Sequence, residues 1–140
     1  MSDVKTKTRD YLDSVKTVSL ATSMESKPSC RIMEIQKVED DLKILFVAHK
    51  SSSKMEQIEK NSSVCIVSFN EETVRDIRLF GKIEVLLDME TKKYVWNEGL
   101  EPYFPGGIND PELTVLKFNP EKLEYRDMKV GGLLPEIENL

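Results

Sequence analysis

Two lysines, three serines and the start of a predicted helix lie together at residues 50–54, KSSSK. An apolar run at residues 42–47 precedes this segment, and an amphipathic pattern follows it. This order indicates a strand, a polar turn and a helix. Ser53 and Glu56 have the spacing of a capping box, which predicts that the helix begins at Lys54.

The same segment has the chemistry of an anion-binding site. The first turn of a helix leaves backbone N–H groups without partners and carries a partial positive charge. The ammonium groups of Lys50 and Lys54 and three serine hydroxyls lie beside it. These groups suit a small dianion such as a phosphate monoester. The residues also fit a well-capped surface helix with a solvated loop, and at this point both interpretations stay open.

Three further polar or aromatic side chains have both a structural and a functional interpretation. Arg31, in a predicted strand, is either a functional residue or an outward charge that pairs with Glu34 or Asp41. His49 is either an exposed loop residue or a proton donor. Trp96 belongs to the core or an interface, or it contacts a bound ring.

Composition excludes several classes of function. The chain has 140 residues and a net charge of −5, which argues against a general nucleic-acid binder. No apolar run approaches the roughly 20 residues needed to span a bilayer, and residues 1–13 lack the apolar core of a secretion signal. We therefore expect a cytoplasmic protein without membrane or nucleic-acid partners. Cys30 and Cys65 are expected to be buried thiols, and with one histidine they do not make a zinc site.

The elements that position these residues are predicted from hydrophobic periodicity. An N-terminal helix follows a Ser2 cap, a second helix follows residue 53, and a third covers residues 89–98. Gly81 interrupts a long strand and predicts a bend or a close backbone approach. An Asn119-Pro120 turn is expected to separate the last two strands, before a loose tail. The predicted strands cover residues 17–22, 29–38, 42–48, 64–69, 76–88, 113–118 and 122–127.

About six to seven short antiparallel strands must curl to remove their edges. We therefore expect one domain over residues 1–140, mainly β with peripheral helices, in which an antiparallel sheet forms a barrel. No linker or repeat divides the chain.

Several windows together resemble one family, the pyridoxamine 5′-phosphate oxidase-like flavoproteins, and within it the short general-stress-protein branch. Their order along the chain matches the family over about residues 15–127. The windows are VSLAT, Pro28 with Arg31, Ser52-Ser53-Lys54, IRLFGK from Ile77, Trp96, the FPGG loop with Asp110-Pro111, and LKFNPEKLEY. The resemblance implies the FMN-binding split-barrel fold and a homodimer with FMN in the groove between the subunits.

The resemblance also implies which residues bind the cofactor. Ser52 and Lys54 match the phosphate-binding pair, with Ser53 where the oxidase has Arg. Asp76 falls near a Gln that contacts the flavin ring, and Trp96 and Phe104 match positions where the partner subunit approaches. The strands that line the flavin contribute Arg31, Ile32, Met33, Glu34, Ala48 and His49.

The activity implied by the resemblance is an FMN-dependent oxidoreductase acting on an unidentified small substrate, with a nicotinamide cofactor as electron donor. The flavin itself carries the hydride chemistry, so no acid–base pair is required. Two alternatives remain open. One is a flavin- or haem-binding module without turnover, and the other is a reductase that uses the deazaflavin F420.

Overall fold

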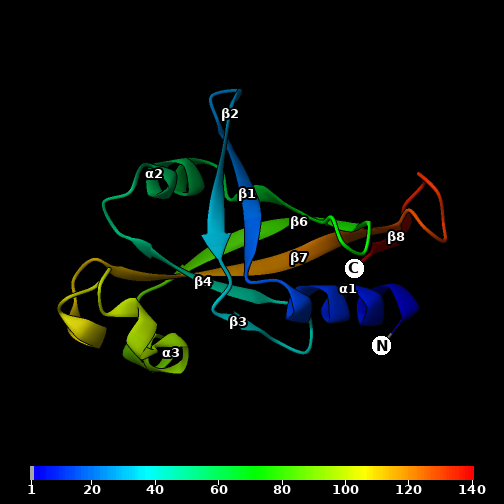
Figure 1. The fold of residues 1–140 in the computed structure, drawn as a ribbon. Helices are drawn as coiled ribbons and strands as arrows, with labels where there is room; N and C mark the ends of the chain where they lie inside the picture. Colours follow the sequence, from blue (N-terminus) through cyan, green and yellow to red (C-terminus); the bar gives the residue numbers. More distant parts are fainter. Residues whose placement is uncertain (1) are drawn as a thin grey trace.

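The computed structural model describes residues 2–140 and consists of an eight-stranded sheet with three α-helices (Figure 1). Every strand pair is antiparallel. The mainly β architecture with peripheral helices is therefore as predicted, with eight strands instead of six to seven. The elements are α1 (Asp3–Ser14), β1 (Thr17–Met24), β2 (Lys27–Glu34), β3 (Lys37–Val38), β4 (Ile44–His49), α2 (Ser53–Lys60), β5 (Ser63–Asn70), β6 (Arg75–Leu86), α3 (Met89–Val95), β7 (Leu113–Asp127) and β8 (Glu136–Asn139), with short 3₁₀ turns at Glu98–Leu100 and Gly107–Asn109.

The strand order leaves one opening in the curled sheet. The order is β2-β1-β5-β6-β7-β4-β3, with β8 paired to β7, so β2 lies at one end of the path. β2 approaches β4, and just after β2 ends the backbone N–H of Gln36 donates to Leu45 O at 2.9 Å. Within residues 2–140, β2 and β4 form no ladder of their own. We call this opening between β2 and β4 the seam.

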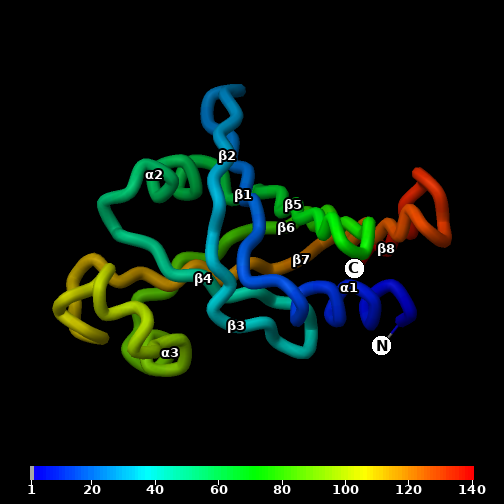
Figure 2. Tube along the Cα trace, viewed as in Figure 1, coloured from blue at the N-terminus to red at the C-terminus, as the bar shows by residue number. Residues whose placement is uncertain are grey.

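The hydrophobic core fills the concave side of the sheet. Leu20, Phe46, Ile66 and Phe118 are fully buried there, and alternation along each strand places them on one face. α1 packs on β7, β8 and β3, α2 packs on β1, and α3 packs on β7. Figure 2 shows α2 and α3 on either side of β4, where that strand reaches the end of the sheet.

At Gly81 the backbone of β7 approaches β6 closely, which is one of the two outcomes that its position in the sequence predicted. A Cβ at Gly81 would clash with Asn119 O, and the β6–β7 register shifts between Phe80 and Gly81. Pro120 pairs opposite Gly81, at the bulge. The predicted turn at Asn119-Pro120 is therefore wrong, because β7 continues through these residues as one strand of 15 residues.

Other expectations are met in part. The Ser2 side chain caps α1 by accepting from Lys5 N, as predicted. The tail is not loose throughout, because β8 pairs with β7. Neither cysteine is fully buried: Cys30 is exposed and Cys65 is half-buried, and each lies opposite Ala21 of β1, on the convex face. Within residues 2–140, none of the helices combines the length and apolarity needed to cross a membrane.

Candidate cofactor site

Arg31 points to the concave side of the sheet and not to solvent. It pairs in register with the fully buried Leu20 of β1, so both side chains share the inner face. Its guanidinium donates to Thr22 Oγ1 at 2.8 Å and to Gln57 Oε1 of α2 at 2.7 Å. Burial lowers the pKa of Arg31 from its usual value. The alternative of an outward charge paired with Glu34 or Asp41 is therefore wrong.

Lys54 brings a second cation to the same place from the first turn of α2. Its Nζ donates to Ser52 Oγ at 3.3 Å. Burial lowers the pKa of the Lys54 ammonium, and the nearby charge of Arg31 lowers it further. Within residues 2–140, the hydrogen bonds of Arg31 and Lys54 all go to neutral oxygens. Two like charges, part-buried and unneutralised, favour binding of an anion.

The helix start differs by one residue from the prediction. α2 begins at Ser53 with Ser52 as N-cap, so the expected start at Lys54 is wrong. The Ser52 side chain makes no capping hydrogen bond to the helix. The hydroxyl at the N-cap therefore remains available beside Lys54, and helix-end N–H groups lack the side-chain acceptor that usually satisfies them.

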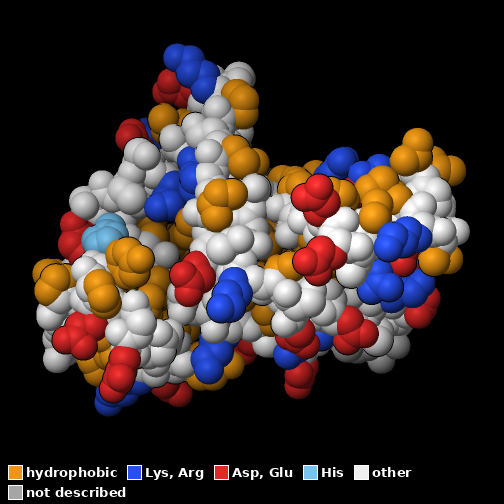
Figure 3. Space-filling model, viewed as in Figure 1, with side chains coloured by type: hydrophobic (Ala, Val, Ile, Leu, Met, Phe, Trp, Pro, Cys, Tyr) orange, Lys and Arg blue, Asp and Glu red, His pale blue; other side chains and the backbone are white. Residues whose placement is uncertain are grey.

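A pocket of about 210 Å³ opens beside Lys54, at the seam. Its apolar wall comes from β2 and β4, and the loop after α3 closes the other side with Gly99, Leu100 and Tyr103. In Figure 3 the pale blue side chain is His49, the single histidine, bordering a hollow that has hydrophobic and basic side chains around it. The pocket brings together seven of the predicted residues: Ile32, Met33, Glu34, Ala48, His49, Lys54 and Phe104.

His49 fixes the loop that closes the pocket. Its ring stacks on Phe104 with centroids 4.4 Å apart, and its Nε2 lies 2.7 Å from Tyr103 O. Phe104 is buried in a small cluster with Leu100 and Leu113. Both interactions orient the imidazole along the loop, so His49 acts here as a structural contact of the pocket wall.

The remaining predicted residues divide into two groups. Arg31 precedes the pocket residue Ile32, Ser53 precedes Lys54, and Ser52 Oγ accepts from Lys54 Nζ, so these three residues adjoin the pocket without lining it. Asp76 lies on β6, away from the pocket, and its carboxylate accepts hydrogen bonds from Nε and Nη2 of Arg126. Trp96 packs against the cluster of Leu100, Phe104 and Leu113 and does not line the pocket.

Several residues of the site were not predicted from the sequence. Thr22 and Gln57 hold Arg31. The pocket lining that was also missed consists of Gln36, Val47, Gly99, Leu100 and Tyr103. The alternation of Val18, Leu20 and Thr22 places Thr22 on the inner face, and Gln57 lies one helical turn after Lys54. These spacings were the available signals.

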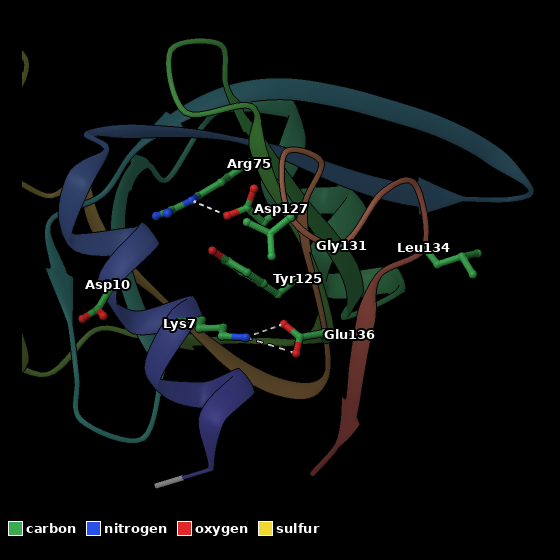
Figure 4. A pocket seen from close by; sticks show the side chains of 9 residues that line it. Lys7, Asp10, Arg75, Tyr125, Asp127, Gly131, Leu134 and Glu136 are labelled. Carbon is green, nitrogen blue, oxygen red and sulfur yellow. Dashed lines mark hydrogen bonds and ion pairs between the residues drawn. The ribbon is translucent and has the colours of Figure 1, made fainter.

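A larger cavity of about 520 Å³ lies between α1 and the segment that leads to β8 (Figure 4). Here each cation has a carboxylate partner. Lys7 Nζ donates to both oxygens of Glu136 at 2.9 and 3.1 Å, and Arg75 Nε donates to Asp127 at 3.0 Å, with Tyr125 between the two pairs. Arg31 of β2 and Lys54 of α2 form no ion pair in the described part of the chain, and these cations, not cavity size, therefore identify the candidate site.

The family model described as "Pyridoxamine 5'-phosphate oxidase like" matches residues 3–138. The chain belongs to this family. General stress protein 26 of Bacillus subtilis is 35% identical over 136 residues, which cover 95% of this chain and 94% of the relative. The resemblance inferred from the ordered windows is confirmed.

Solved structures confirm the split-barrel fold. A Clostridium acetobutylicum protein related to general stress protein 26 superposes with a TM-score of 0.84 at 26% identity, covering 97% of this chain and 94% of that one. Two more distant structures share the fold. One is an FMN-binding protein of Nostoc punctiforme, with a TM-score of 0.71 at 15% identity over 100% of this chain and 97% of that one. The other is a haem-binding protein of Mycobacterium smegmatis, with a TM-score of 0.76 at 11% identity over 99% of this chain and 59% of that one. Members of this fold thus include proteins described as binding FMN and haem.

Proposed function

We propose that this protein binds FMN and acts as an oxidoreductase on a small substrate. The observation that carries the proposal is the pair of unneutralised cations, Arg31 and Lys54, beside an apolar pocket at the start of α2. A phosphate monoester joined to a flat aromatic ring matches both parts. Membership of the pyridoxamine 5′-phosphate oxidase-like family supports the same ligand.

The residues present fit this cofactor. The phosphate is assigned to Arg31, Lys54 and the Ser52 hydroxyl, where a dianion relieves the repulsion between the two cations. The ring is assigned to the slot of Ile32 and Ala48, where apolar side chains exclude water from one face. FMN, when bound, supplies the hydride transfer, and the side chains bind it and orient it.

The chain alone forms only part of such a site. Sites for molecules of this size enclose about 300–1,000 Å³, which exceeds the 210 Å³ of the pocket. Ser19 pairs with Ile32 on one side and Val67 on the other, so these residues share the convex face. Ile32, Val67 and Phe69 are 66%, 40% and 53% exposed, and Figure 3 shows hydrophobic side chains along the β1–β2 hairpin. We propose that a second copy covers this face and completes the site.

Haem is the less favoured ligand. Haem iron takes an axial side chain such as histidine. The chain has one histidine, and its imidazole is stacked on Phe104 and contacts Tyr103 O.

Spectroscopy and mass analysis of the purified protein test the proposal. We expect a flavin absorption spectrum, or its appearance on addition of FMN, and a released cofactor with the mass of FMN and not of F420. Reduction of the bound flavin by a nicotinamide donor distinguishes an oxidoreductase from a module without turnover. A colourless protein that does not bind added FMN at micromolar concentration overturns the proposal.

A further inference from the structure

The hydrogen bonds of Arg31 occupy one edge of its guanidinium and leave another free. A guanidinium has five N–H groups. Nη1 donates to Thr22 Oγ1 at 2.8 Å and to Leu20 O at 3.1 Å, with a longer contact of 3.5 Å to Ser29 O. Nη2 donates to Gln57 Oε1 at 2.7 Å. Among residues 2–140, the Nε–H and the second Nη2–H have no acceptor.

The two acceptors lie side by side. The Thr22 hydroxyl donates to Gln57 Oε1 at 2.6 Å, so Thr22 and Gln57 accept together from the Nη1–Nη2 edge. The remaining N–H groups, on Nε and Nη2, are parallel and belong to the adjacent edge. That edge has the fork geometry that binds two oxygens of a phosphate or carboxylate.

Gln57 is itself fixed in one orientation. Its Oε1 accepts from both Thr22 and Arg31, and its Nε2 lies 3.4 Å from Ser29 Oγ. Gln57 lies on α2, three residues after Lys54, so it links the guanidinium on β2 to the helix that carries the second cation. Thr22 is 3% exposed, and water therefore does not readily replace its hydroxyl.

From these contacts we infer that Gln57 and Thr22 are positioning residues: they orient Arg31 so that its free edge binds the flavin phosphate, and thereby make the site prefer FMN to riboflavin. This inference rests on the proposed function. Both acceptors are neutral, so they orient the guanidinium without cancelling its charge. A carboxylate in place of the Gln57 amide would keep the hydrogen bond but form an ion pair and repel the phosphate.

The test compares dissociation constants for FMN and riboflavin, measured by quenching of flavin fluorescence in the full chain. Gln57→Glu is expected to weaken FMN binding by about tenfold or more, as loss of a charge-assisted contact does, and to change riboflavin binding by less than about twofold. Gln57→Met and Thr22→Val, which remove an acceptor, are expected to lower the FMN-to-riboflavin preference by a smaller factor. Thr22→Ser retains the hydroxyl and is expected to keep the FMN-to-riboflavin preference of the wild-type protein.

Asn61→Asp is the matched control. It makes the same amide-to-carboxylate change at the C-cap of the same helix, and its Oδ1 keeps the hydrogen bond from Ser63 N at 3.1 Å. Riboflavin affinity reports on folding of every variant, and the Thr22 variants provide the test if Gln57→Glu does not fold. Equal loss of both flavins, or an unchanged preference in the Gln57 and Thr22 variants, overturns the positioning role while the proposed function stands. A wild-type protein that binds neither flavin refutes the proposed function itself.

Discussion

Replacing Lys54 with methionine should change ligand binding and stability in opposite directions. Methionine keeps most of the length and the apolar stem but removes the charge. In the free protein, burial and the charge of Arg31 both lower the pKa of Lys54, so the ammonium is held at a cost to the fold. An anion bound by Arg31 and Lys54 reverses that cost. Lys54→Met is therefore expected to weaken FMN binding without destabilising the free protein.

The magnitude follows from the contact that is lost. A hydrogen bond to a charged group contributes about 1.5–3 kcal/mol, and 1.4 kcal/mol corresponds to about tenfold in affinity. FMN binding should weaken by about 10- to 100-fold, and riboflavin binding should change little. Relief of the repulsion should leave the free energy of unfolding of the free protein unchanged or raise it by about 0.5 kcal/mol, which is about 2 °C in Tm.

Fluorescence titration with both flavins and thermal unfolding of the flavin-free protein measure the two effects. Lys60→Met is the control, because Lys60 lies exposed in the last turn of the same helix. An unchanged FMN affinity in Lys54→Met would show that the cation has no role in binding. A fall of several degrees in Tm would show that Lys54 has a structural role instead.

Three other perturbations test the remaining features. Val67→Glu with Phe69→Glu is expected to convert a dimer to monomers by placing charge on the convex apolar face, and sedimentation measures the mass; a wild-type monomer would contradict the proposed assembly. Gly81→Ala is expected to lower the free energy of unfolding by about 1–3 kcal/mol in denaturant titrations, because its Cβ meets Asn119 O, and an unchanged midpoint would show that the bulge relaxes freely. FMN affinity relative to riboflavin should fall as pH rises through the Lys54 pKa, which lies below its usual value of 10.5, because the neutral amine loses its attraction for phosphate; Lys54→Arg should keep the ratio constant over the same range.

Much of the fold was predictable because local patterns and tertiary packing agree. The alternation of Val18 and Leu20 with hydroxyl residues gave β1, and the apolar positions after Ser2 gave α1. Gly81 was recognised as a bend or a close approach because glycine within a strand lacks a side chain to pack. In each case the structure that the local sequence favours is also the structure that packing of the core requires.

The turn predicted at Asn119-Pro120 failed because a tertiary contact outweighs the local signal. Proline lacks an N–H and usually ends a strand. Here Pro120 lies opposite Gly81, where the register shift removes the need for a regular hydrogen bond. The sequence contains both residues, but their pairing across nearly 40 positions is not visible in either segment alone.

The cations of the site were predicted from the sequence, but the residues that hold Arg31 in place were not. Lys54 and Ser52 could be found because helix-start chemistry is local. The contact between Thr22 and Gln57 joins residues 35 positions apart, so only the folded sheet brings them together. The inward direction of Arg31 likewise depends on its register with Leu20, which a one-residue shift would reverse.

The seam has a consequence for how this architecture can diversify. Ladder bonds elsewhere hold the strands, whereas Gln36 N to Leu45 O supplies a backbone bond across this opening. The exposed side chains that border it, Ile32 and Glu34, can therefore be exchanged during evolution at little cost to the fold, whereas the buried Met33 and Ala48 cannot. Substitutions at these exposed positions can alter ligand preference while the hydrogen-bonded sheet stays intact.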